Sequence, residues 1–230
     1  MQRGCIARAA TGLMALLQPF AGTFTVVPLA AVFLLDPGSR LLSASIGLLL
    51  LLRPLLGLVQ IDLPLYVIAI STVASTFAPL ASRRLEALAG SIVYLTVTVL
   101  LGYPLAMLIS SGALSSERIL FLAMLGGLSG AFLNHVSRKR DFAVPFGSAM
   151  VMWFFSFDYP LPDLDRILII CIFALVLGIG AYFARAADSD AVISETIVGL
   201  LVILFGGARW FMLLLAFYLM GGAFTRYGYA

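Results

Sequence analysis

The sequence predicts an all-α integral membrane protein, a bundle of about eight to ten transmembrane segments. Three observations lead to this fold class. Of 230 residues, 62% are hydrophobic and only 11% are charged, and the mean hydropathy is +1.10. A soluble domain has about a quarter charged residues. Apolar runs recur along the whole chain, and no polar stretch is long enough for a separate soluble domain, so most of the chain must be solvated by lipid.

Each apolar run is compared with the roughly 20 residues that a spanning helix needs. The predicted membrane segments are residues 9–35, 41–59, 63–80, 85–110, 119–136, 143–157, 167–184 and 191–224. The first run exceeds one span, and Pro19 either kinks it or divides it into two half-helices. Gly206–Gly207 breaks the last run. Arg53–Pro54 interrupts the second and either ends a short helix at the interface or places a functional charge in the membrane.

Charged loops predict an orientation for the middle of the chain. Arg83–Arg84 and Arg138–Arg140 should face the cytoplasm, because cytoplasmic loops are enriched in Lys and Arg. The loop of residues 158–165, with three aspartates, should face the other side. The number of membrane crossings before Arg83 stays open. The N-terminal arginines favour a cytoplasmic N-terminus, but a single first helix would then give an odd number of crossings before Arg83. The protein is expected to be a multi-pass protein of the cell membrane.

The sequence argues against several kinds of site. Two cysteines, Cys5 and Cys171, predict no disulfide framework, and a single histidine, His135, excludes a histidine metal cluster. One short basic run is too little for a nucleic-acid surface. That run is Arg138, Lys139 and Arg140, interpreted as a cytoplasmic loop or as a site for an anionic lipid or phosphate.

Small and aromatic residues predict how the segments pack. Gly126 and Gly130 form one G-x-x-x-G pattern, which favours close helix packing, with a substrate groove as the alternative. Trp153 and Trp210 lie near segment ends, where aromatic belts are expected.

Two regions resemble known membrane families. The stretch Glu195–Tyr229, with Gly222, Thr225 and Arg226 near its end, resembles the opening of the "domain of unknown function 92" family, which includes phytyl-phosphate kinase. The resemblance implies that residues 188–230 are the opening helices of a second membrane domain. It also leads us to expect that the chain is an N-terminal fragment of a longer protein.

The middle of the chain resembles the polyprenol kinase family, which includes dolichol kinase and phytol kinase. The similar segments are 71–80, 85–102 and 138–154. Ser71 stands where the family has Asp, and Ala89 replaces Glu before Gly90 and Ser91. Lys139 and Arg140 replace two Asp, Asp141 takes the Asn position, and Pro145 is kept. Residues 1–187 therefore resemble a degenerate polyprenol kinase.

The departures remove the residues that the family uses for chemistry. Its acidic residues are expected to hold Mg²⁺ on a nucleotide, and Mg²⁺ demands oxygen ligands. We therefore expect no catalytic residue, metal site or cofactor in this chain, although a complete protein would use Mg²⁺ and CTP or ATP. Whether that protein is an enzyme stays open.

The leading hypothesis is a non-catalytic membrane protein related to isoprenoid phosphate kinases. Its expected partners are membrane lipids and a prenyl phosphate lipid, without nucleic acid. The headgroup or phosphate would lie at Arg138, Lys139, Arg140 and Asp141. A transporter of small solutes or lipids is the alternative, favoured by Pro- and Gly-interrupted helices. A non-catalytic assembly subunit is the third hypothesis.

Overall fold

The computed structural model of the protein is helical throughout the part of the chain that it describes. The structure describes residues 6, 8–13, 17, 40–112, 114–157, 169, 172–173, 176, 198–199, 201–203, 207, 209–218 and 220. Every regular element among them is a helix, which confirms the all-α fold class. The chain divides into two compact units, Met1–Tyr159 and Pro160–Ala230. The boundary expected from the family resemblances, after residue 187, lies inside the second unit.

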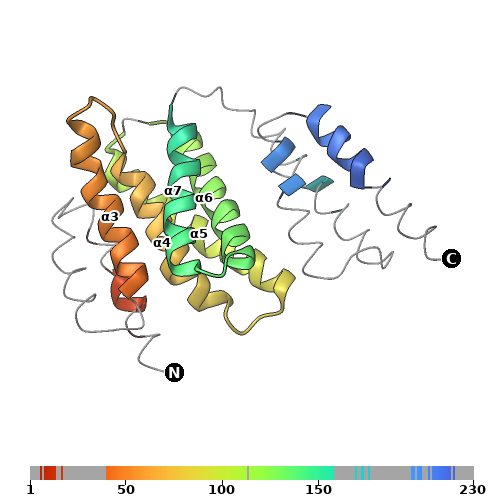
Figure 1. Ribbon diagram of the computed structural model, residues 1–230, viewed down its shortest axis with the longest axis horizontal. Coiled ribbons are helices and arrows are strands. Elements are labelled where there is room, and N and C mark those ends of the chain that lie inside the picture. The colour runs from red at the N-terminus through yellow and green to blue at the C-terminus, as the bar shows by residue number, and fades with distance from the viewer. Residues whose placement is uncertain are drawn as a thin grey trace. The chain divides into compact units, whose positions relative to one another are not determined.

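Five helices of the first unit form a bundle (Figure 1). They are α3 (Arg40–Gly57), α4 (Leu65–Ser82), α5 (Ala87–Ser110), α6 (Ser116–Val136) and α7 (Arg140–Ser156). Among the described helices, α3 to α6 are long and apolar enough to cross a membrane, and α7 has 17 residues. The five helices coincide with the segments predicted between residues 41 and 157, and four of them, α3 to α6, have the length and hydropathy of a spanning helix. The segments predicted at both ends of the chain lie largely outside the described residues.

Contacts between the helices fix their relative directions. The Tyr94 hydroxyl of α5 donates to the Ala74 carbonyl of α4. A Cβ added at Gly102 would lie 3.4 Å from Ile70, and one added at Gly90 would lie 3.5 Å from the Ser82 carbonyl. Residue numbers therefore rise along α5 while they fall along α4, so the two helices are antiparallel.

The glycines of α6 allow three other helices to approach it. A Cβ at Gly126 would lie 2.5 Å from Met152 of α7 and 2.9 Å from Ile70 of α4. One at Gly130 would lie 2.9 Å from the Tyr94 hydroxyl of α5. Neighbouring side chains already fill these spaces. The packing interpretation of the G-x-x-x-G pattern is therefore confirmed, and the groove alternative is not.

The interruption expected at Arg53–Pro54 does not end α3. The helix passes through Pro54 and ends at Gly57, about one turn later. Proline removes one helical hydrogen bond, here to the Leu50 carbonyl, and so close to the end of a helix that loss is tolerated. Arg53 is half-buried, and Asp62 is exposed beyond the helix end. The Asp62 carbonyl accepts a hydrogen bond of 2.7 Å from the Trp153 indole, which lies near the end of α7 as expected.

Phe211 is a buried contact among the described residues of the second unit. This residue belongs to the helix Arg209–Tyr218 and is 8% exposed. Its ring lies 6.0 Å from that of Phe173, and a Cβ at Gly199 would lie 3.1 Å from it. Gly207 has a φ of 75°, a left-handed conformation that interrupts a right-handed helix. Gly206 and Ala208 lie outside the described residues, so the break predicted at Gly206–Gly207 stays a prediction.

Candidate functional site

Positive charge gathers at one end of the first unit. Because consecutive helices alternate in direction, this end holds the starts of α3, α5 and α7 and the ends of α4 and α6. Six exposed cations lie there: Arg40, Arg83, Arg84, Arg138, Lys139 and Arg140. Glu86 is an exposed acid at the same end, whereas Asp62 and Glu117 are exposed at the other. The two predicted basic loops therefore share one end, which we call the basic end.

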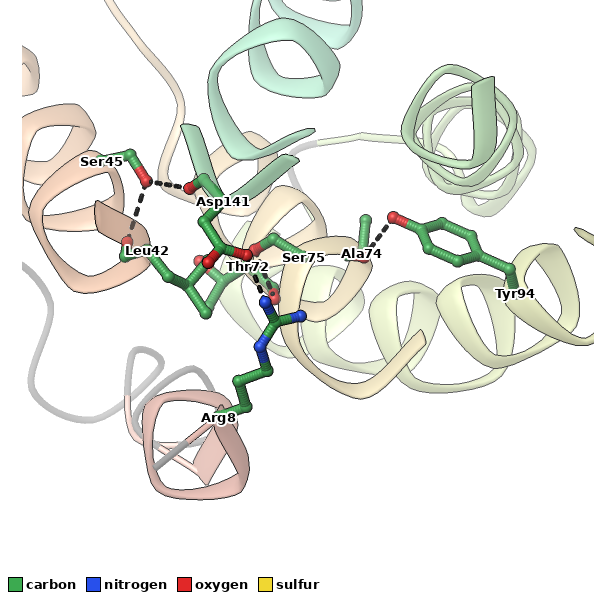
Figure 2. Close-up of polar contacts among 8 residues, drawn as sticks. All are labelled: Arg8, Leu42, Ser45, Thr72, Ala74, Ser75, Tyr94 and Asp141. Carbon is green, nitrogen blue, oxygen red and sulfur yellow. Dashed lines mark hydrogen bonds and ion pairs between the residues drawn. The ribbon is translucent and has the colours of Figure 1, made fainter. Parts of the chain in front are cut away.

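An ion pair joins the N-terminal segment to α7 at the basic end. The Arg8 guanidinium donates through Nη2 to the Asp141 carboxylate, across 133 positions of sequence. Figure 2 shows the Arg8 side chain reaching from its own helical segment to Asp141 in the first turn of α7. The two side chains are 30% and 23% exposed. The pair therefore balances the charge of Asp141 while remaining accessible to solvent.

A second contact holds Asp141 through its backbone. Pro145 has no N–H and cannot donate to the carbonyl four residues before it, which is that of Asp141. The Ser45 hydroxyl of α3 lies 2.9 Å from this carbonyl oxygen and 2.9 Å from the Leu42 carbonyl (Figure 2). Side chain and main chain of Asp141 are thus tied to two different segments.

The buried hydroxyls of α4 face their own helix. Ser71 and Thr72 donate to the Ile68 carbonyl at 2.8 and 2.7 Å. Ser75 and Thr76 donate to the Thr72 carbonyl at 3.0 and 2.7 Å. All four side chains are at most 3% exposed. Because each hydroxyl proton already has a backbone acceptor, the four hydroxyls of this apolar helix offer no free donor.

The kinase-like motif positions lie at different levels of the bundle. Ser71 is fully buried in the middle of α4, and Pro145 is buried in α7. Gly90 is buried near Ser82 of α4. Ser82 lies eleven residues after Ser71 in the same helix, which corresponds to about 16 Å of helix rise. Ser91, beside Gly90, is half-buried. Gly90 and Ser91 therefore share the basic end with Lys139, Arg140 and Asp141, whereas Ser71 lies deeper in the bundle.

The other predicted site residues divide into three groups. Arg138, Lys139 and Arg140 are exposed, and Asp141 is paired with Arg8. The C-terminal motif residues Gly222, Thr225 and Arg226 lie outside the described residues.

The described residues do not fit a Mg²⁺-nucleotide site. Among them no three His, Cys, Asp or Glu side chains are grouped as metal ligands. Asp141 is the one carboxylate at the motif positions that the structure describes, and Arg8 already occupies it. A divalent cation would have to displace that guanidinium and would meet three neighbouring cations. The cluster around Asp141 therefore carries an excess of positive charge.

Sequence reasoning missed the role of Arg8. The sequence indicates it only as one of the N-terminal arginines that bear on the topology. Its partner lies 133 residues away, and no local spacing connects the two. The available signal was a lone aspartate, Asp141, directly before the apolar run at 143–157, where an unbalanced charge is costly.

Comparisons with known proteins agree with the membrane assignment. No curated protein and no solved structure matches the chain. A family model described as "Integral membrane protein DUF92" matches residues 172–230, a range that includes the stretch Glu195–Tyr229. With α3 to α6 long and apolar enough to cross a bilayer, this match makes the chain an integral membrane protein, about a quarter of which is similar to the DUF92 family.

Proposed function

We propose that the chain is a non-catalytic membrane unit that binds an isoprenoid phosphate, with the phosphate at the basic end and the isoprenoid chain in the lipid. The observation that carries the proposal is the charge around Asp141. Arg138, Lys139 and Arg140 are exposed immediately before Asp141, and Arg8 balances the negative charge of Asp141. The cluster therefore has an excess of positive charge at the level of lipid headgroups, which attracts anions.

The choice of an isoprenoid phosphate rests on two further features. The first is the resemblance of Glu195–Tyr229 to the family that includes phytyl-phosphate kinase; the family match at residues 172–230 supports the DUF92 part of that resemblance. The outer faces of the helices also carry exposed apolar side chains, among them Leu41 and Leu48 of α3 and Phe142 of α7. A single amphiphile with a phosphate head and a branched apolar tail matches both surfaces.

A binding measurement tests the proposal. The full chain in lipid nanodiscs is titrated with phytyl phosphate, phytol, inorganic phosphate and phosphatidylglycerol. We expect binding of phytyl phosphate that phytol does not reproduce. The triple variant R138Q/K139Q/R140Q should weaken this binding about 100-fold, from about 1 kcal/mol for each cation removed. Equal binding of phytol, or no binding of phytyl phosphate, would contradict the proposal.

A matched control separates the cluster from general positive charge. The double variant R83Q/R84Q removes two exposed cations at the same end, on the connection between α4 and α5. Its affinity for phytyl phosphate should fall by less than threefold. Tighter binding of phosphatidylglycerol than of phytyl phosphate would instead indicate a general anionic-lipid surface.

The same preparation tests the absence of catalysis. With Mg²⁺ and radiolabelled CTP or ATP, we expect no transfer of phosphate to phytyl phosphate, because Ser71, Ala89, Lys139 and Arg140 replace the acidic positions of the family that the chain resembles. Mg²⁺-dependent turnover by the purified chain would show that the motifs are misaligned.

A further inference from the structure

We infer that Arg8 is the inner cation of the headgroup site and that Asp141 is the residue that positions it. This inference rests on the proposed function, since it assigns a residue to the same site. Arg8 lies outside every kinase-like motif region of the sequence and comes from the N-terminal segment. The structure brings it to the first turn of α7, beside the exposed cations of that helix start.

The geometry leaves Arg8 able to bind a second anion. A guanidinium has five N–H donors, and the pair with Asp141 uses Nη2. The Arg8 side chain is 30% exposed, so the remaining donors are not sealed inside the bundle. Arginine binds phosphate and carboxylate through the same planar fork of donors, so it can hold one while facing the other.

Burial distinguishes Arg8 from its neighbours. The Arg8 side chain is 30% exposed, and its partner Asp141 is 23% exposed. Arg138, Lys139 and Arg140 are exposed. Charge interactions are stronger where less water screens them. Arg8 therefore meets the inner oxygens of a bound phosphate, and the exposed cations meet the outer ones.

The role of Asp141 follows from its two tethers. The Ser45 hydroxyl fixes its carbonyl, and its carboxylate fixes the Arg8 guanidinium. Gly12, one helical turn after Arg8, packs against α4, where a Cβ would lie 2.6 Å from Phe77. Asp141 thus anchors a cation whose own segment also contacts the bundle. Losing the carboxylate frees the long Arg8 side chain to leave the site.

Charge balance and positioning predict opposite results for one substitution. D141N removes a negative charge next to an anion site, so electrostatics alone would tighten phosphate binding. If Asp141 positions Arg8, D141N must weaken binding instead. The proposal therefore predicts a loss of affinity from a change that makes the site more positive.

The experiment measures phytyl phosphate binding to full-length variants in nanodiscs. We expect R8Q to weaken binding about tenfold and D141N at least threefold. The double variant R8Q/D141N should bind at least as tightly as R8Q alone, because without Arg8 there is no guanidinium for Asp141 to position and only the removal of its negative charge remains. Inorganic phosphate, tested in parallel, should follow the same order if the headgroup alone is recognised. If only phytyl phosphate binding follows this order, the apolar chain of the lipid is needed to bring the phosphate to Arg8.

A distant variant controls for general loss of stability. W153F removes the hydrogen bond from Trp153 to the Asp62 carbonyl at the other end and should leave affinity unchanged. Equal or tighter binding by D141N, or full affinity in R8Q, would overturn the inference while wild-type binding upholds the proposed function. Absence of phytyl phosphate binding by the wild-type chain would overturn both the inference and the proposed function.

Discussion

The Ser45 hydroxyl lies 2.9 Å from the Asp141 carbonyl oxygen, which Pro145 leaves without its helical donor. A hydroxyl of α3 thus replaces a backbone N–H that α7 lacks. The contact joins α3 and α7 through two residues that are 96 positions apart in sequence. Because Ser45 is buried, its hydroxyl satisfies a carbonyl that has no helical donor and so stabilises the start of α7.

Ser45→Ala should destabilise the protein by about 1–2 kcal/mol, because it leaves the Asp141 carbonyl without a donor. Pro145→Ala restores the missing N–H, so Ser45→Ala should cost less than half as much in that background. Unfolding in mixed micelles of increasing dodecyl sulfate content measures both. Ser148→Ala is the control, because the Val144 carbonyl that Ser148 contacts keeps its helical donor. An equal cost of Ser45→Ala in both backgrounds would disprove the replacement.

Gly126→Ala should destabilise the bundle by about 1–3 kcal/mol. Its Cβ would meet Met152, which can move, and the Cγ2 of Ile70 at 2.9 Å, which belongs to a stiff β-branched side chain. Gly47→Ala in α3 meets nothing within 4 Å and should be neutral or stabilising by up to about 1 kcal/mol. Thermal unfolding in detergent measures the difference. Similar stabilities of the two variants would argue against close packing at α6.

Tyr94→Phe should cost about 1 kcal/mol, because it removes the hydrogen bond to the Ala74 carbonyl but leaves that carbonyl its helical donor. Tyr94→Ala should cost about 3–5 kcal/mol, since the side chain is 2% exposed and a cavity would remain between α4, α5 and α6. Comparing the two unfolding free energies separates hydroxyl from ring. A loss as large for Phe as for Ala would show that the hydroxyl dominates.

A cysteine at Ser137 should stay unlabelled by an impermeant thiol reagent in intact cells, with Cys5 and Cys171 replaced. The basic end faces the cytoplasm if it follows the charge bias of membrane proteins. A cysteine at Ser116, exposed at the start of α6, lies at the other end and should be labelled. Permeabilised cells provide the control for access to both sites. The reverse pattern would invert the orientation.

Local rules predicted much of the first unit. Apolar length and charged connections predicted α4 to α7 within a few residues of their bounds, because each depends on short-range hydropathy. The effect of Pro54 was misjudged, since its cost depends on how close the helix end lies. The end at which the N-terminal segment lies was left open by loop charges. The pair between Arg8 and Asp141 now places Arg8 at the basic end.

The site was only half predictable. The basic run at Arg138, Lys139 and Arg140 is visible in sequence and is exposed in the structure. The partners of Asp141 are not visible, because Arg8 and Ser45 approach it from segments 133 and 96 positions away. Such pairings depend on helix arrangement and register, which hydropathy does not specify.

The separation of Arg8 from Asp141 also sets an order in time. A ribosome adds about 5–20 residues per second, so the 133 positions between the two correspond to roughly 7–27 seconds of synthesis. Throughout that interval Arg8 has been made and its partner has not. The N-terminal segment can be fastened only after α3, α4, α5 and α6 have been synthesised. This ion pair can therefore form only after the first unit has been synthesised up to the start of α7.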